Sequence, residues 1–151
     1  MRKDAIRTIA ICVFRNGSRI LVAEYFDTIK QQTFYRPLGG TIEFGEHSDE
    51  TISREMMEEI KAEVTDLRYL GMLENIFVYE GEKGHEIVLV YDGKFVDRSL
   101  YEKTTIAGDE SGLRFRAVWI DLSAVGPGKP PLYPHGLAEL LSSDDNEKSP
   151  V

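Results

Sequence analysis

The chain has 151 residues, of which 42% are hydrophobic and 29% are charged, a composition typical of one soluble globular domain. Its formal net charge of −8 argues against sequence-independent binding of duplex nucleic acid, which needs a basic face. The single cysteine, Cys12, rules out an intrachain disulfide, and its apolar surroundings predict a small buried side chain and a cytoplasmic, reducing setting. The N-terminus has no long apolar segment, so we expect no signal peptide and no contact with a membrane.

The chain opens with two predicted strands, Ile6–Phe14 and Arg19–Tyr25, which are apolar and rich in β-branched residues. The Asn16-Gly17 pair between them is a strong hairpin signal. Residues Phe26–Gln32 are polar, and they predict a loop.

An extended segment, Thr33–Arg36, is expected next, and it leads into Pro37, which excludes a helix at this point. Gly39 and Gly40 follow, and two glycines in a row let the backbone approach a ligand closely. Residues 41–47 form a short extended stretch with a glycine turn.

An acidic helix is predicted over residues 49–61, with Ser48 at its N-cap. At about 100° per residue, Glu55, Glu58 and Glu59 fall within an arc of roughly 100° on one face. Like charges at these spacings destabilise a helix by roughly 0.2–0.5 kcal/mol per pair. We therefore expect a positive partner opposite them, and a hard divalent cation with oxygen ligands suits this need.

The rest of the chain predicts more strands and one short helix. The expected strands are Val64–Asn75, Ile76–Tyr79, Glu86–Phe95 and Arg114–Ile120. The expected connections are the hairpin tip Glu80–His85, the long polar loop Val96–Leu113 and the connector Ala124–Pro131. A helix over Leu137–Leu141 ends the predicted single domain, 1–141, and residues 142–151 are expected to be a disordered acidic tail. Together these elements predict an α/β fold with a mixed, largely antiparallel sheet covered by helices.

A long, spaced pattern of polar residues runs through the 40–60 segment. Five residues separate Gly40 from Glu46, and seven more precede Arg54-Glu55-Met56-Met57-Glu58-Glu59. This pattern resembles the Nudix box, the loop and helix signature of the Nudix hydrolase family. All the fixed polar positions match, and Met56 matches the first apolar one. The order of hairpin, box, strands and terminal helix is similar to the family's α/β/α sandwich.

The chain departs from the family pattern on both sides of the box. The late glycine of the box is Lys61 here, and Ala62 follows it. A left-handed Lys61 would cost on the order of 1 kcal/mol, and the alternative is a helix that continues toward Glu63. Before the glycine pair, Pro37-Leu38 stands in place of the commoner Leu-Pro order.

The resemblance implies a pyrophosphohydrolase that cleaves a nucleoside diphosphate linked to some group X. The implied cofactor is Mg²⁺, with Mn²⁺ as the alternative. The implied metal ligands are Glu55, Glu58, Glu59 and the carbonyl group of Gly39.

The resemblance also assigns roles in catalysis and in substrate binding. The implied catalytic residues are Glu46, Arg54, Glu55 and Glu58. Within this set, Glu46 and Arg54 act as supports, and either Glu55 or an acidic residue of a loop takes the proton of the attacking water. The residues expected to bind substrate are Arg36, Gly39 and Gly40.

Weaker candidates lie outside the box, and ordinary surface charge or core packing explains each of them as well. The carboxylates that could assist the metal site are Glu86, Glu102, Asp109 and Glu110. The aromatic side chains that could stack on a base are Phe34, Tyr35, Phe77 and Tyr79. Substrate specificity is expected to come from residues 26–32, 76–85 and 96–113.

Two other functions stay open. One is a non-catalytic Nudix-like module that senses a nucleotide, which the complete set of carboxylates disfavours. The other is isomerisation of an isoprenoid diphosphate, an activity known on this fold, for which Cys12 is a poor candidate. The expected ligand is in each case a small molecule, and a homodimer is one expectation because dimers are common among similar proteins.

Overall fold

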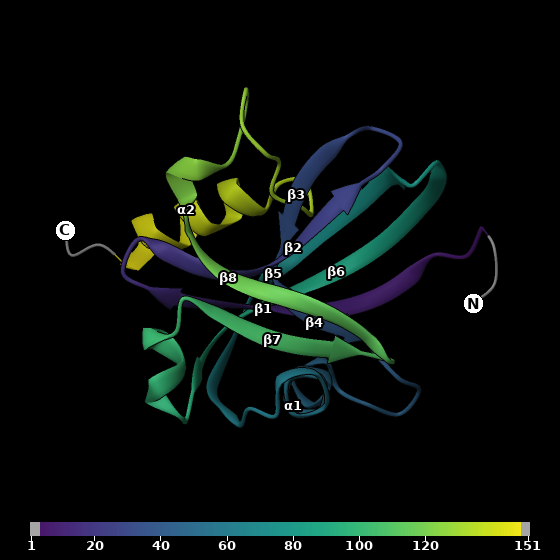
Figure 1. Cartoon of the computed structure of the whole chain (residues 1–151). Coiled ribbons are helices and arrows are strands. Elements are labelled where there is room, and N and C mark those ends of the chain that lie inside the picture. The colour runs from purple at the N-terminus through teal and green to yellow at the C-terminus, as the bar shows by residue number, and fades with distance from the viewer. Residues whose placement is uncertain (1–3, 149–151) are drawn as a thin grey trace.

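Residues 4–148 are described by the computed structural model in Figure 1. Its strands are β1 Arg7–Asn16, β2 Arg19–Asp27, β3 Gln32–Arg36, β4 Leu38–Thr41, β5 Val64–Tyr79, β6 Glu82–Phe95, β7 Thr105–Glu110 and β8 Leu113–Asp121. Its helices are α1 Ser48–Ile60, α2 Leu137–Lys148 and the short 3-10 helices η1 Arg98–Glu102 and η2 Leu122–Ala124. Within this part of the chain, no helix has the length and apolar character needed to span a membrane.

The strands form one eight-stranded sheet between the two α-helices (Figure 1). The strand order is β5-β6-β1-β2-β8-β7, while β3 pairs with β2 and β4 pairs with β1. Among the pairings of these strands, β1 with β6 is parallel and the others are antiparallel. The predicted α/β sandwich with a mixed, largely antiparallel sheet is confirmed.

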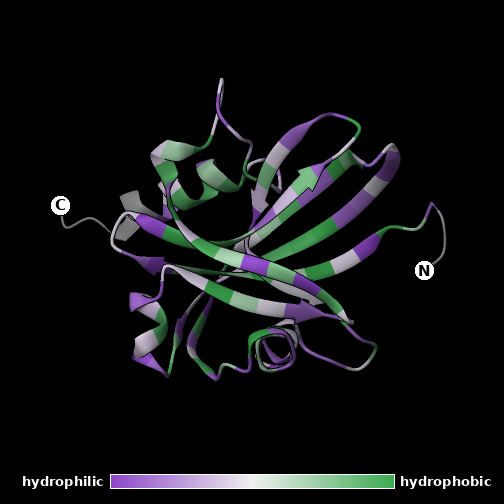
Figure 2. Cartoon of the chain, viewed as in Figure 1, coloured by the Kyte–Doolittle hydropathy of each residue, from purple (hydrophilic) through white to green (hydrophobic). Residues whose placement is uncertain are grey.

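Strand β1 is buried on both faces, which explains why its sequence is a continuous apolar run rather than an alternating one. Its side chains point alternately into two cores, and Figure 2 shows the apolar segments of the central strands in green. The core on the α1 side contains Ala10, Cys12, Phe14, Ile52 and Met56. The core on the α2 side contains Ile9, Ile11, Val13, Leu137 and Leu141. Cys12 is fully buried, as predicted.

Helix α1 begins one residue before its predicted start, and its N-cap is His47 rather than Ser48. The backbone N–H of His47 donates to the Glu50 carboxylate (2.9 Å), one half of a capping box. The Ser48 hydroxyl instead contacts the Tyr91 hydroxyl on β6 (2.5 Å). Ser48 therefore fastens the start of the helix to the sheet.

Helix α1 ends at Ile60 because Lys61 adopts the left-handed conformation, with φ 56° and ψ 37°. The N–H of Ala62 then donates to the Met56 carbonyl (3.2 Å), an arrangement that usually has glycine at the left-handed position. The helix therefore does not continue toward Glu63.

Replacing Lys61 with glycine should stabilise the fold by about 1 kcal/mol, because glycine has no Cβ to oppose the left-handed conformation. Urea denaturation measures this free energy of unfolding. Lys61→Ala is the matched control, since it removes the same charge but keeps the Cβ atom. Equal stability of the glycine and alanine variants would contradict the prediction.

Strands β5 and β6 form a longer hairpin than predicted. Residues Ile76–Tyr79 continue β5 without a break and β6 begins at Glu82, so the turn consists of Glu80-Gly81 alone. His85, predicted to lie at the hairpin tip, is in the ladder opposite Ile76. Cross-strand pairing keeps these polar residues extended, and their local composition does not reveal that pairing.

The prediction of a long loop over Val96–Leu113 is wrong, because the segment contains both η1 and β7. Only Ile106 and Gly108 of β7 are buried, so the strand carries almost no apolar alternation in its sequence. It forms at the edge of the sheet, where pairing with β8 supplies its hydrogen bonds.

Helix α2 is longer than the predicted Leu137–Leu141, and residues 142–148 are helical rather than a frayed tail. Arg68 on β5 donates to both carboxylate oxygens of the largely buried Asp144 (3.0 and 3.1 Å), which anchors the helix to the sheet. The predicted domain boundary after residue 141 thus falls inside α2. Residues 149–151 of the predicted tail lie outside the described part.

Candidate functional site

The glycine pair lies in β4, which runs antiparallel to β1. A Cβ atom on Gly39 would lie 2.0 Å from the Ala10 carbonyl oxygen, and one on Gly40 would lie 2.4 Å from the carboxyl carbon of Glu55. Both distances are far below van der Waals contact. The close approach that these glycines permit is therefore to β1 on one side and to the Glu55 carboxylate on the other.

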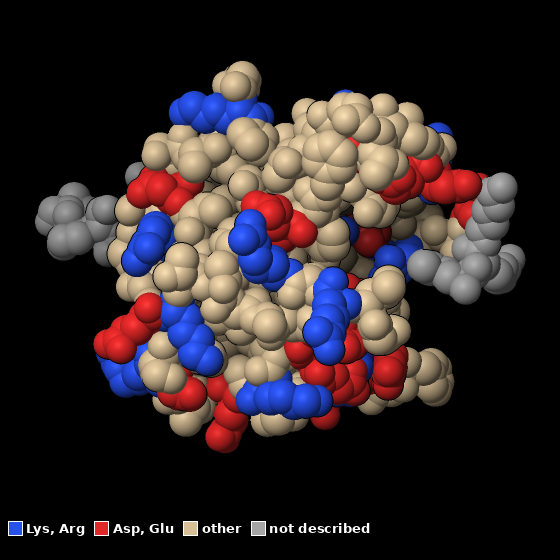
Figure 3. Space-filling model, in the orientation of Figure 1, with Lys and Arg blue, Asp and Glu red and all other residues tan. Residues whose placement is uncertain are grey.

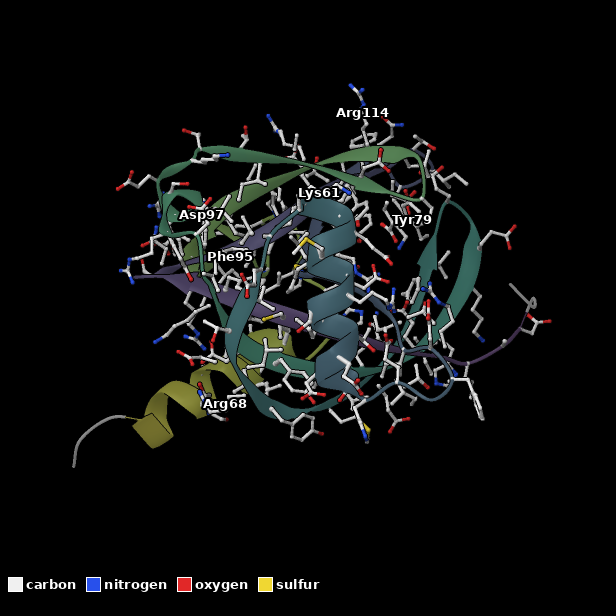
Figure 4. All side chains as sticks on the ribbon, turned by 90° about the horizontal axis from the view of Figure 1, so that it is seen from below. Lys61, Arg68, Tyr79, Phe95, Asp97 and Arg114 are labelled. Atoms are coloured by element: carbon white, nitrogen blue, oxygen red, sulfur yellow. The ribbon has the colours of Figure 1, made fainter. Side chains whose placement is uncertain are left out.

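A cavity of about 570 Å³ opens beside Gly40, between α1 and the β7–β8 turn, and its walls are mainly charged. The box residues that line it are Gly40, Thr41, Glu43, Arg54, Glu55, Glu58 and Glu59. Lys61, at the late glycine position of the box, also lines it, and the residues from outside the box are Arg7, Asp109, Glu110 and Ser111. Figure 3 shows acidic side chains gathered at the lower right, where the end of α1 lies beside the tip of β7. Figure 4 shows Lys61 at that end of the helix.

Glu59 is the most deeply placed carboxylate of this acidic cavity, with 6% of its surface exposed. Burial, followed by the negative charges of Glu110, Glu55 and Glu58, raises the pKa of Glu59 to about 9. Its Oε2 atom is buried without a hydrogen-bond partner. A buried carboxylate oxygen without a partner is costly, and such an oxygen is a suitable donor for a cation.

Glu55 lies one turn before Glu59 and faces the same cavity. Burial raises the pKa of Glu55, while the hydrogen bond and the charge of Arg54 act in the opposite direction. Glu58 is more exposed and contacts the Arg54 guanidinium at 3.3 Å. The three carboxylates of the predicted face thus line one cavity, although they differ in depth.

Arg54 braces the loop against the helix. It donates to both oxygens of Glu46 (2.7 and 3.0 Å), to Glu55 (2.8 Å) and to the Thr41 carbonyl oxygen (3.0 Å). The hydrogen bonds from Arg54 and then from the Thr51 hydroxyl lower the pKa of Glu46 to about 2. Glu46 therefore stays ionised and holds Arg54, and Arg54 in turn fixes the orientation of the Glu55 carboxylate.

The pattern of the whole chain matches a known family model. A model described as NUDIX domain matches residues 5–142. The chain belongs to the Nudix family. It is 38% identical over 65 residues to the NAD-capped RNA hydrolase NudC of Erwinia tasmaniensis, a match that spans 41% of this chain and about a quarter (24%) of NudC.

Solved structures of Nudix proteins share the fold. The MutT NUDIX hydrolase of Burkholderia pseudomallei has a TM-score of 0.64 at 18% identity, over 92% of this chain and 98% of that chain. A NUDIX hydrolase of Nitrosomonas europaea has a TM-score of 0.65 at 15% identity, over 95% of this chain and 91% of that chain. These likenesses support the α/β Nudix architecture.

Nudix proteins generally use a divalent metal ion, and this acidic cavity suits one. The unpartnered Glu59 oxygen and the neighbouring Glu55 carboxylate are hard oxygen donors, and a bound cation would favour the ionised form of both. Within residues 4–148, no three His, Cys, Asp or Glu side chains are already grouped as a metal cage. Mg²⁺ characteristically uses one or two carboxylates together with waters and substrate phosphates.

The weaker candidates divide clearly. Asp109 and Glu110 line the acidic cavity, whereas Glu102 lines a separate cavity near the β1–β2 turn, away from the box. Glu86 is buried and bridges Arg7 (3.5 Å) and Arg36 (3.2 Å). Glu110 is the last residue of β7, and pairing of this strand with β8 places Glu110 beside the box.

Arg36 lies apart from the acidic cavity, in the walls of two further cavities of about 70 and 230 Å³. The smaller one is also lined by Gly39, Gly40, Glu59 and Glu110, so it adjoins the box carboxylates. The larger one is lined by Phe34, Phe77 and Tyr79, but not by Tyr35. Arg7, Tyr25 and Tyr133 also line it, and they were not predicted because nothing in the local sequence distinguishes them.

Proposed function

We propose that this Nudix protein is a Mg²⁺-dependent pyrophosphohydrolase that cleaves the diphosphate linkage of a nucleoside diphosphate joined to a group X. The observation that carries the proposal is the buried, unpartnered carboxylate oxygen of Glu59 in a cavity with Glu55 and Glu58. The activity named for NudC, hydrolysis of NAD-capped RNA, belongs to the same reaction class. The NAD cap of that RNA also contains a diphosphate linkage.

Glu55, Glu58 and Glu59, with the Gly39 carbonyl group, would hold the Mg²⁺ ion, and Mn²⁺ could take its place. When bound, the ion supplies charge neutralisation for the diphosphate and acidifies a water molecule. Arg54 contributes by holding the Glu55 carboxylate in place (2.8 Å), and Glu46 does so through Arg54.

The attacking water needs a proton acceptor within the cavity. Glu110 is our candidate, because it lines the acidic cavity and its charge acts directly on Glu59. Glu55 is the alternative acceptor. Isoprenoid isomerisation gains no support, since Cys12 is fully buried in the core and burial holds its thiol pKa well above the usual value.

Four further properties belong to the proposal: the compartment, the kind of substrate, the extent of the domain and the assembly. We place the enzyme in the cytoplasm, acting on a small molecule rather than on duplex nucleic acid. We take residues 1–141 as the catalytic domain, a boundary that lies within α2. A homodimer is the proposed assembly.

A substrate panel tests the function. We expect turnover of at least one member when the protein is incubated with Mg²⁺ and nucleoside triphosphates, dinucleoside polyphosphates, NAD⁺, ADP-ribose, nucleotide sugars or NAD-capped RNA, with loss of activity on adding EDTA. Glu102→Gln is the matched control, because this carboxylate lies outside the acidic cavity and its loss should leave the rate unchanged. Absence of turnover by folded protein would count against the enzyme, and tight nucleotide binding without turnover would favour the sensor.

A further inference from the structure

Two arginines share one buried carboxylate between the acidic cavity and the cavity of about 230 Å³ that Phe34, Phe77 and Tyr79 line. We call the latter the aromatic cavity. Arg7 on β1 and Glu86 on β6 are direct neighbours in the parallel ladder, and Arg36 reaches the same carboxylate from the end of β3. Arg7 Nη1 lies 3.5 Å from Glu86 Oε2, and Arg36 Nη2 lies 3.2 Å from Glu86 Oε1. Each carboxylate oxygen thus faces one guanidinium group. We call this group of three residues the arginine pair with its buried glutamate.

Burial decides the role of each member. Glu86 is 1% exposed and engages an arginine with each oxygen, so it serves as an internal counter-ion rather than as a metal ligand. The side chains of Arg7 and Arg36 keep 34% and 22% of their surface exposed. The Thr41 hydroxyl accepts a further hydrogen bond from Arg7 (2.7 Å), which fixes that side chain. The group therefore has an excess of one positive charge, held in place and partly open to the cavities.

The position of these arginines relates them to the metal site. Arg7 lines all three cavities, and Arg36 lines the small cavity together with Glu59 and Glu110. A phosphate group placed beside the arginines is therefore adjacent to the box carboxylates. Glu86 forms an ion pair with both guanidinium groups, while Glu59 and Glu110 line the same small cavity.

The aromatic cavity, on the other side of the arginines, suits a planar aromatic group. Aromatic rings line it. The centroid of the Phe34 ring lies 5.3, 5.5 and 5.5 Å from those of Tyr25, Tyr79 and Tyr133. Asn75 also lines it; its carboxamide oxygen accepts the His135 N–H (3.3 Å), so its amide end is the donor left for a ligand. Aromatic walls with a few polar groups are the usual lining of a nucleobase site.

The rim of this aromatic cavity is built before any ligand arrives. The Asp27 carboxylate accepts the N–H groups of Ile29 and Lys30 and that of Glu80 on the facing hairpin turn. Lys30 Nζ donates to the Val78 carbonyl oxygen (2.6 Å). The 28–31 turn and the β5–β6 turn are thus tied together, which fixes the width of the cavity.

We propose that Arg7 and Arg36, oriented by Glu86, bind the phosphate of the nucleotide whose base enters the aromatic cavity. The aromatic cavity would then recognise the nucleotide half of the substrate and not X. The inference rests on the proposed function for its catalytic consequence, but the binding event it describes needs no hydrolysis.

Binding of product-like nucleotides tests the inference directly. The probes are AMP, GMP, CMP and UMP and the corresponding nucleosides, titrated into the protein in Mg²⁺ buffer and followed by calorimetry and by amide shifts in NMR. We expect at least one monophosphate to bind. Arg7→Ala and Arg36→Ala should each weaken that binding by roughly 10- to 100-fold, the range expected for a lost charge-assisted hydrogen bond, and leave nucleoside binding unchanged.

Control variants separate recognition from folding and from general charge. Arg116→Ala removes a positive charge from β8, where Arg116 pairs with Glu24 and lines none of the three cavities, and it should bind like the parent. Arg36→Lys keeps a charge opposite Glu86 if the alanine variant fails to fold, and it should bind more weakly than the parent. Tyr79→Ala should weaken nucleotide and nucleoside alike.

The results that overturn the inference are distinct from failure of the proposed function. The inference is overturned if no monophosphate binds the parent, if either arginine variant binds as tightly as the parent, or if nucleoside binding falls equally. If the parent binds a monophosphate through the arginines but hydrolyses no substrate, the proposed enzyme activity is refuted and the phosphate site stands. If the Arg7→Ala and Arg36→Ala variants hydrolyse the substrate with the KM of the parent, the phosphate site is refuted and the proposed enzyme activity stands.

Discussion

Glu59→Gln should reduce hydrolysis by several orders of magnitude and, at the same time, make the metal-free protein more stable. Glu59 is a proposed metal ligand, so its loss removes a donor that the reaction needs. The same carboxylate is a burden on the fold, because it is buried and one of its oxygens has no partner. A substitution that removes function and adds stability identifies a group kept for chemistry.

The pH dependence gives the sign of the stability effect. The folded-state pKa of Glu59, about 9, lies above the ordinary value of 4.5, so the folded chain holds a proton that the unfolded chain releases between these values. The stability of the parent due to this group is complete below pH 4.5 and is lost as the pH rises toward 9. Glutamine removes this loss, so the variant should gain about 1 to 3 kcal/mol at pH 7 and nothing near pH 4.5.

Chemical denaturation of both proteins at pH 4.5 and pH 7, with EDTA and with Mg²⁺, measures these differences. Mg²⁺ should stabilise the parent and not the variant, because binding to the native state shifts the unfolding equilibrium. Glu63→Gln is the control, since Glu63 is exposed and lies outside the cavity. A variant that is less stable than the parent at pH 7 without metal would refute this account of Glu59.

Alanine at Gly39 and alanine at Gly40 should fail in different ways, although the two residues are adjacent. A Cβ atom at Gly39 would lie 2.0 Å from the backbone oxygen of Ala10 and 2.7 Å from the Ile11 Cα atom. Neither strand can yield without breaking the β1–β4 ladder. We expect Gly39→Ala to cost about 3 kcal/mol or more in unfolding free energy, or to prevent folding.

At Gly40 the new methyl group would meet the end of a side chain instead, since all three nearest atoms belong to the Glu55 carboxylate. That carboxylate can move, but only by leaving its 2.8 Å contact with Arg54. We therefore expect Gly40→Ala to fold, with a smaller stability loss, and to lower kcat and Mg²⁺ affinity strongly. Gly17→Ala serves as the reference for Mg²⁺ affinity: a Cβ there would meet nothing within 4 Å but would strain the backbone at φ +63°, so this variant should lose stability and keep its Mg²⁺ affinity. Equal Mg²⁺ affinity in Gly40→Ala and the parent would show that Glu55 is not displaced.

The box could be identified from the sequence because its chemistry is local. The carboxylates of Glu55, Glu58 and Glu59 share a helix face through spacing alone, and the structure lines one cavity with them. The strong apolar runs also predicted β1 and β8 to within two residues, since burial on the sheet imposes that pattern. The first hairpin followed from the Asn16-Gly17 pair.

The family, the fold class and the acidic helix that the proposed reaction uses could therefore all be predicted from the order of the residues. The left-handed conformation of Lys61, the strand over residues 105–110 and the position of Glu110 close to Glu59 emerge only in the folded chain. Folding also brings Arg7, Arg36 and Glu86, which are far apart in the chain, into one group between two cavities. The physical reason is that helix spacing is written in consecutive residues, whereas strand pairing and shared burial depend on segments that meet only in the folded chain.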